Sequence, residues 1–171
     1  MYPEWVLNKK KADEASLEER LVAILSAKGL TITTAESCTG GLIAGTLVNV
    51  SGASDVLNEG YVTYSNEAKE RLVGVKHETL ETYGAVSEQT AAEMARGAAK
   101  AAHADVALSA TGIAGPGGGT EEKPVGLVYI GCYALGKTKV LKCQFTGTRM
   151  ENRMQTVEDA LTLAVEQLEG C

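Results

Sequence analysis

The amino-acid sequence predicts an α/β fold, a three-layer α/β/α sandwich around a mixed β-sheet. Apolar residues at helical spacing alternate along the chain with short β-branched runs, which is typical of helices that cover both faces of a sheet. Two segments of alternating polarity, residues 125–134 and 138–146, follow each other near the end of the chain. They are joined by Leu135-Gly136-Lys137, so a β-hairpin is expected to add antiparallel strands to the sheet.

Capping residues mark the helices. Ser16 followed by Glu19 is a capping-box pattern, and Gly29 ends the apolar periodicity that follows it. Ser65 or Asn66 and then Ser87 are good N-cap residues for two later helices. The helices predicted in this way lie at residues 16–28, 42–50, 66–73, 78–83, 87–103 and 149–168.

The strands are short apolar or β-branched runs that end at glycine or polar residues. Before the hairpin, such runs lie at residues 30–34, 61–64 and 105–110. The last of them leads into a glycine-rich loop, residues 111–119, where glycine allows positive φ and close approach of the backbone to a ligand. A Walker loop is excluded because no Gly-Lys-Ser/Thr follows. Glycine-rich loops are often only connectors, and both interpretations remain open at this point.

Size and composition indicate one soluble domain. The chain has 171 residues with 44% hydrophobic and 22% charged residues, enough for a single core at residues 15–171 behind a polar leader at residues 1–14. The net charge of −6 argues against nucleic acid or an anionic membrane as a partner. No apolar run is long enough to span a membrane, and the charged N-terminus does not fit a signal peptide.

Cysteine and histidine usage narrows the chemistry further. The four cysteines show no paired spacing, which favours reduced thiols and a cytoplasmic protein. The two histidines, His77 and His103, do not belong to a ligand-like cluster. A dedicated metal site is therefore not expected.

The most informative stretch joins the first strand to the second helix. Its glycines, Gly40 and Gly41, predict a turn that leaves Ser37 exposed beside the start of the helix. Unpaired N–H groups at a helix start carry the positive end of the helix dipole and form an anion or oxyanion site. This geometry suits an acyl-transfer nucleophile. The alternative is that Ser37 or Thr39 only caps the helix.

Three cations lie near helix starts, where the helix dipole disfavours them. Lys69 falls in the first turn of its helix, and Arg149 and Arg153 lie one turn apart at the start of the last helix. The two arginines could clamp a phosphate together with the N–H groups of that helix. A solvated lysine and ordinary surface arginines are the alternatives.

Three stretches, in this order along the chain, resemble a known family. Residues 34–41 read TAESCTGG, residues 61–69 read YVTYSNEAK, and TGIAGP at residues 111–116 continues to KPVG at residues 123–126. Together they resemble the CinA C-terminal domain family, the competence-damage-inducible proteins whose active members are nicotinamide-nucleotide amidohydrolases. The resemblance spans about residues 16–168, and the chain looks like a stand-alone version of the domain.

The resemblance implies a role for individual residues. Ser37 of AESCTGG would be the nucleophile, with Tyr64 and Lys69 of TYSNEAK as its activating partners. Thr111 and Arg149 would lie at the substrate, although Thr148 stands where an acidic residue often precedes that arginine. The backbone near Ser37 and the glycine-rich loop would complete the oxyanion and substrate site, with the residues Thr39, Gly40, Gly41, Gly112 and Gly115.

The implied reaction is hydrolysis of nicotinamide mononucleotide to nicotinate mononucleotide and ammonia through an acyl-serine. It requires neither a metal nor an organic cofactor. Lysine titrates near ~10.4, so a neutral amine at neutral pH requires its pKa to fall by about 3, or roughly 4 kcal/mol, which burial can supply. Cys38, also near the helix start, is the rival nucleophile.

The resemblance leaves a second class of function open, and it also suggests an assembly. A non-catalytic nucleotide-sensing or partner-binding domain of the same fold is the alternative to an enzyme. The complete set of Ser37, Tyr64 and Lys69 favours the enzyme. The family also suggests a homodimer or larger homo-oligomer.

Overall fold

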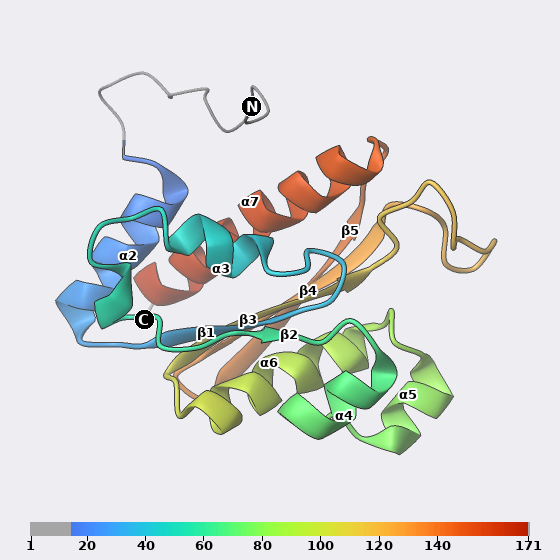
Figure 1. The fold of residues 1–171 in the computed structure, drawn as a ribbon, viewed down its shortest axis with the longest axis horizontal. Coiled ribbons are helices and arrows are strands. Elements are labelled where there is room, and N and C mark those ends of the chain that lie inside the picture. Colours follow the sequence, from blue (N-terminus) through green and yellow to red (C-terminus); the bar gives the residue numbers. More distant parts are fainter. Residues whose placement is uncertain (1–14, 171) are drawn as a thin grey trace.

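The protein contains a mixed five-stranded sheet (Figure 1). The computed structural model describes residues 15–170, so the predicted leader at residues 1–14 lies outside the described part. The strand order is β2-β1-β3-β4-β5, with β2, β1 and β3 parallel and β4 and β5 antiparallel. The strands are β1 (Ile32–Glu36), β2 (Tyr61–Val62), β3 (Val106–Gly112), β4 (Leu127–Ala134) and β5 (Lys137–Gln144).

Helices cover both faces of this sheet, which confirms the predicted three-layer α/β/α sandwich. Helices α2, α3 and α7 lie on one face, and α4, α5 and α6 lie on the other (Figure 1). Within the described residues, no helix is both long and apolar enough to cross a membrane. The helices are α2 (Leu17–Lys28), α3 (Leu42–Leu47), α4 (Asn66–Val73), α5 (His77–Tyr83), α6 (Glu88–Ala102) and α7 (Arg149–Glu169), with a 3-10 turn η1 (Ala53–Asp55).

Two hydrophobic cores lie on opposite faces of the sheet, and the central strand β3 contributes residues to both. Leu108 and its neighbours at every second position pack toward α2 and α7, whereas Ala107 packs toward α6. Ser109, also on the α6 face, donates a hydrogen bond of 2.7 Å to the carbonyl oxygen of Ala91. A Cβ at Gly131 would lie only 2.6 Å from that same oxygen. Glycine on β4 therefore lets α6 approach the sheet closely.

The predicted elements agree with the structure except at several ends. Helix α3 stops at Leu47 instead of residue 50, because the chain tightens into i to i−3 hydrogen bonds there. Strand β2 has only two residues, and β3 continues to Gly112. The hairpin turn is shorter than predicted, since only Leu135 and Gly136 separate the two strands, both at positive φ.

The parallel strands bring the three sequence motifs together. Strands β1, β2 and β3 point the same way, so their carboxyl ends meet at one edge of the sheet. Ser37 follows β1, the segment leading to Lys69 follows β2, and the glycine-rich loop begins at the end of β3. This edge of the sheet is where a functional site is expected.

Candidate active site

The turn that carries Ser37 is fixed directly to the sheet. The amide of Ser37 donates a hydrogen bond of 2.9 Å to the carbonyl oxygen of Ala110 on β3, and the amide of Gly40 donates to the carbonyl oxygen of Ser37. Ser37 remains partly exposed, while Cys38 and Thr39 are buried. The hydroxyl of Ser37 is thus available to a small molecule.

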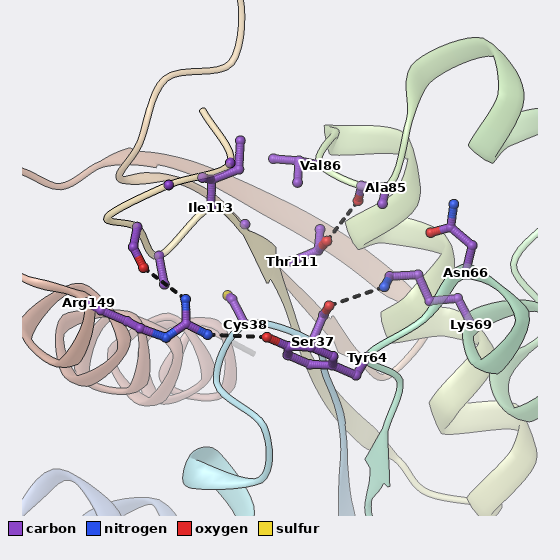
Figure 2. A pocket seen from close by; sticks show the side chains of 15 residues that line it. Ser37, Cys38, Tyr64, Asn66, Lys69, Ala85, Val86, Thr111, Ile113 and Arg149 are labelled. Atoms are coloured by element: carbon purple, nitrogen blue, oxygen red, sulfur yellow. Dashed lines mark hydrogen bonds between the residues drawn. The ribbon is translucent and has the colours of Figure 1, made fainter. Parts of the chain in front are cut away.

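The side chain of Lys69 points at that hydroxyl from α4 (Figure 2). Its Nζ lies 3.1 Å from Ser37 Oγ and 2.8 Å from the carbonyl oxygen of Thr63. The Lys69 side chain is only 1% exposed, and no carboxylate of the described residues pairs with it. Burial lowers the pKa of this amine because a buried ammonium loses its hydration, although nearby Cys38 opposes the effect.

These contacts suit a neutral amine. A neutral lysine amine has two N–H donors and one lone pair, and the Thr63 carbonyl can accept one of those N–H groups. The lone pair is then free to accept the proton of Ser37 Oγ. The arrangement therefore places an amine within hydrogen-bonding distance of a serine hydroxyl, which is the geometry that general-base catalysis requires.

The start of α3 differs from the prediction. The carboxylate of Glu36, which is 0% exposed, accepts hydrogen bonds from the amides of Gly41, Ile43 and Ala44 at 2.9–3.0 Å. The prediction that the first amides of this helix are free to hold an oxyanion is therefore wrong. The capping alternative is also wrong for Ser37 and Thr39, because the cap is the side chain of Glu36.

The opposite wall of the site is the loop that follows β3. At the end of β3, the hydroxyl of Thr111 donates a 2.7 Å hydrogen bond to the carbonyl oxygen of Ala85, which ties the start of this wall to the segment before α6. Gly115 has a φ of +87°, and a Cβ there would lie 2.5 Å from Val125 Cγ1. This wall thus requires glycine both for its backbone conformation and for its packing.

Arg149 and Tyr64 close the third side. The guanidinium of Arg149 donates hydrogen bonds to the carbonyl oxygen of Gly115 at 2.9 Å and to the hydroxyl of Tyr64 at 3.2 Å (Figure 2). Thr148, which stands where an acidic residue was expected, caps α7 in a capping box with Glu151 and so fixes the start of the helix that carries Arg149. Tyr64 is 64% exposed. Its hydroxyl accepts a hydrogen bond from Arg149 and makes none with Ser37 or Lys69.

Arg153 does not line the pocket and makes different contacts from Arg149. Its guanidinium donates hydrogen bonds to the carbonyl oxygens of Cys38 and Thr39, both at 3.0 Å. Arg149 lines the pocket, whereas Arg153 lies against the backbone behind the serine turn. The two arginines are therefore not brought together as the predicted phosphate clamp.

Most of the predicted site residues surround one pocket of about 280 Å³. Its lining includes the predicted residues Ser37, Tyr64, Lys69, Thr111, Gly112, Gly115 and Arg149. Thr39, Gly40 and Gly41 do not line it, and the amides of both glycines are already hydrogen-bonded within the chain. These three predicted binding residues thus belong to the support of the turn.

The comparisons with known proteins agree with these motifs. Residues 14–168 match the model of the CinA C-terminal domain. The chain belongs to the CinA C-terminal domain family. A CinA-like protein of Kosmotoga olearia is 60% identical over 148 residues, which are 86% of this chain and 36% of that protein. A putative competence-damage inducible protein of Clostridium acetobutylicum is 58% identical over 144 residues, 84% of this chain and 35% of that protein. The chain thus spans little more than a third of the length of these relatives.

Solved structures of the CinA family share the fold. The competence/damage inducible protein CihA from Agrobacterium tumefaciens has a TM-score of 0.85 at 44% identity, covering 94% of this chain and 99% of that one. A CinA superfamily protein from Klebsiella pneumoniae has a TM-score of 0.87 at 36% identity, covering 91% and 97%. The α/β/α fold class is therefore confirmed by family members as well as by the topology.

Three pocket residues of this CinA-family chain outside the glycine-rich loop were not predicted from the sequence. They are Asn66, Ala85 and Val86. Asn66 begins α4 one turn before Lys69, and its side chain points to the same space (Figure 2). The spacing of three residues from Lys69 on one helix was the available signal. Val86 lies in an irregular segment between two helices and had no such signal.

The rival nucleophile Cys38 lines the same pocket, but its thiol is not activated. Cys38 is buried, and burial raises the pKa of its thiol to about 11, so the thiol carries its proton at neutral pH. Neither histidine lines the pocket, and the ring of His77 instead contacts Glu70 on the surface. In the described part of the chain no cluster of histidine, cysteine and acidic side chains could hold a metal ion.

Proposed function

We propose that this chain is a serine amidohydrolase that converts nicotinamide mononucleotide to nicotinate mononucleotide and ammonia. The observation that carries the proposal is the buried Lys69 amine at 3.1 Å from Ser37 Oγ. A lysine that is buried without a carboxylate partner is a candidate base, because burial lowers the pKa of its amine. The choice of substrate rests on membership of the CinA family and on the chemistry below.

The reaction proceeds in two halves. Ser37 Oγ attacks the carboxamide carbon while its proton passes to the Lys69 amine, and a C–O bond forms. The C–N bond then breaks, and the Lys69 ammonium gives that proton to the leaving nitrogen, which departs as ammonia. Water attacks the acyl-serine with Lys69 again as base. The carboxylate product is released, and Ser37 regains its proton.

The oxyanion requires N–H donors that are not already used. The amides of Cys38 and Thr39 donate no hydrogen bond to another of the described residues, in contrast to those of Gly40 and Gly41. The amide of Cys38, directly after the nucleophile, is the first candidate. The amides of Gly117 and Gly118 in the pocket wall are further candidates.

Arg149 is the proposed phosphate ligand. Its guanidinium contacts two neutral groups, Gly115 O and Tyr64 Oη, and no carboxylate of the described residues neutralises it. An uncompensated guanidinium at the rim of a small pocket attracts an anion, and its planar fork suits phosphate. Tyr64 then contacts the substrate or orients Arg149. Any contribution of Tyr64 to the activation of Ser37 would require the bound substrate to connect the two residues.

The alternative is a nucleotide-sensing or partner-binding domain without turnover. The test is to incubate the protein with nicotinamide mononucleotide and a chelator, and to measure ammonia and nicotinate mononucleotide while calorimetry measures binding. Formation of both products supports the amidohydrolase. Binding without products supports the sensing domain. The absence of both binding and products contradicts this substrate.

We also propose where the protein acts and how it assembles. We propose a cytoplasmic enzyme, because the cysteines in the described residues, Cys38, Cys132 and Cys143, are all free thiols. A homodimer or larger homo-oligomer stays a prediction, and sedimentation of the purified protein tests it. We propose that the protein acts on a small-molecule substrate and that neither nucleic acid nor a membrane is its partner.

A further inference from the structure

We propose that Arg153 is a positioning residue that holds the serine turn in its reactive conformation. It extends from α7 to the backbone behind the nucleophile and does not line the pocket. The inference rests on the proposed role of Ser37 as nucleophile. The sequence left two interpretations of Arg153 open, half of a phosphate clamp or an ordinary surface arginine.

The contacts of Arg153 are specific to a guanidinium. Its Nε donates to the carbonyl oxygen of Cys38 and its terminal nitrogen donates to that of Thr39, each at 3.0 Å. One planar fork thus holds two successive carbonyl groups of the turn. A lysine ammonium is a point donor on a flexible stem and cannot reproduce that geometry. Gly40 lies next to the guanidinium, because a Cβ at this position would be in van der Waals contact with it at 3.7 Å.

Holding these carbonyl groups also fixes neighbouring N–H groups. The peptide bond is planar, so the carbonyl of Cys38 and the N–H of Thr39 point in opposite directions from one rigid unit. The N–H of Thr39 has no partner among the described residues. Arg153 therefore sets the direction of an unpaired donor directly behind the nucleophile, and it limits rotation of the Cys38 backbone that follows Ser37.

The beginning of α7 holds the opposite wall in the same way. The buried side chain of Asn152 donates to the carbonyl oxygen of Ala114 at 3.0 Å and accepts from the amide of Gly147. Arg149 donates to the carbonyl oxygen of the next loop residue, Gly115. Side chains from one helix thus bind both the serine turn and the glycine-rich loop. Their relative position, and with it the shape of the pocket, depends on α7.

The experiment measures two properties that do not depend on the substrate. A small sulfonyl fluoride reports the reactivity of Ser37, since Oγ–S bond formation expels fluoride and the serine proton passes to Lys69. Amide hydrogen exchange at residues 38–41 reports the order of the turn. Both are compared in the parent, Arg153→Ala, Arg153→Lys and Arg96→Ala, where Arg96 is an exposed arginine on α6.

We expect labelling of Ser37 to fall on the order of 10- to 100-fold in Arg153→Ala, because small displacements of a nucleophile slow its reaction by such factors. Exchange at residues 38–41 should rise in the same variant. Added guanidinium ion should restore part of the labelling in Arg153→Ala, and Arg153→Lys should remain slow although it keeps the charge. Arg96→Ala should match the parent in both measurements.

The outcomes separate the two proposals. If Arg153→Ala keeps the labelling rate and the exchange of the parent, the positioning role is wrong. If Arg153→Lys keeps the parent's labelling, the positive charge and not the fork is what matters, which also contradicts the proposal. If Ser37 of the parent does not react but exchange still rises in Arg153→Ala, the turn is held by Arg153 and it is the nucleophile of the proposed function that fails.

Discussion

The amine of Lys69 lies 3.1 Å from the hydroxyl oxygen of Ser37, and the Thr63 carbonyl holds the same amine at 2.8 Å. Strand β1 brings Ser37 to the edge of the sheet, and the first turn of α4 brings Lys69. Burial removes water from the amine and lowers its pKa. The fold thus places beside the serine a buried amine, which is the base in the proposed reaction.

Replacing Lys69 by methionine should remove this base. We expect the reactivity of Ser37 toward a sulfonyl fluoride to fall on the order of 100- to 10,000-fold. In the parent the rate should rise with pH as Lys69 loses its proton, with an apparent pKa below 10.5, the ordinary value for lysine. The variant should lack that rise. An unchanged pH profile in Lys69→Met would show that another group is the base.

The same substitution should change stability in a pH-dependent way. Because burial lowers the pKa of Lys69 in the folded state, the unfolded chain binds its proton more readily. Stability of the parent should therefore rise with pH from the folded-state pKa up to 10.5. Lys69→Met should be more stable than the parent near neutral pH and should lose this advantage as pH approaches 10.5. Urea unfolding at a series of pH values measures the difference, and a constant difference would contradict the buried-amine account.

Glu36 should be important for stability. Its carboxylate accepts three backbone amides at the start of α3 and is fully buried. Glu36→Gln places an amide N–H₂ against one of these donors, which should lower the free energy of unfolding by about 3 kcal/mol. Exposed Glu121 provides the control Glu121→Gln, for which urea unfolding should show little change. Equal stability of the two variants would contradict the proposed cap.

Arg149 should recognise the phosphate of the substrate. Arg149→Ala should raise KM for nicotinamide mononucleotide on the order of 10- to 100-fold, since a charge-assisted hydrogen bond is lost. KM for nicotinamide riboside, which has no phosphate, should not rise comparably. Steady-state kinetics with both compounds measures the contrast. The same rise for both compounds would indicate that Arg149 only supports the loop through Gly115.

Cys38 should be chemically silent in the folded protein. Burial raises the pKa of its thiol to about 11, so iodoacetamide at neutral pH should label it only after unfolding. Peptide mass spectrometry before and after addition of denaturant measures this directly. Rapid labelling of Cys38 in the folded state would restore it as a candidate nucleophile.

The sequence was sufficient to predict the layers and the motifs that meet at the pocket. Capping residues such as Ser16 and Ser87 marked helix starts, because side-chain caps are local interactions. The mixed sheet followed from the alternation of helices and strands with a hairpin near the end. The resemblance to the CinA C-terminal domain family pointed to Ser37, Lys69 and Thr111, and the parallel strands bring these residues to one edge. These features depend on short-range patterns and on topology.

The wrong predictions concern side chains whose hydrogen-bond partners are distant in the sequence or could not be expected from it. The glutamate before the serine, Glu36, turns back to cap α3 and accepts the amide of Gly41, while the amide of Gly40 donates to the carbonyl oxygen of Ser37. Arg153 contacts carbonyl groups more than a hundred residues earlier, at Cys38 and Thr39. Spacing on α7 alone could not distinguish such a contact from a phosphate clamp with Arg149.

The most direct test of the central claim compares the parent, Ser37→Ala and Cys38→Ala in the release of nicotinate mononucleotide from nicotinamide mononucleotide. The account predicts product from the parent and from Cys38→Ala. It predicts loss of several orders of magnitude in Ser37→Ala, as expected when a nucleophile is removed. Release by Ser37→Ala at the rate of the parent, or its loss only in Cys38→Ala, would contradict Ser37 as the nucleophile.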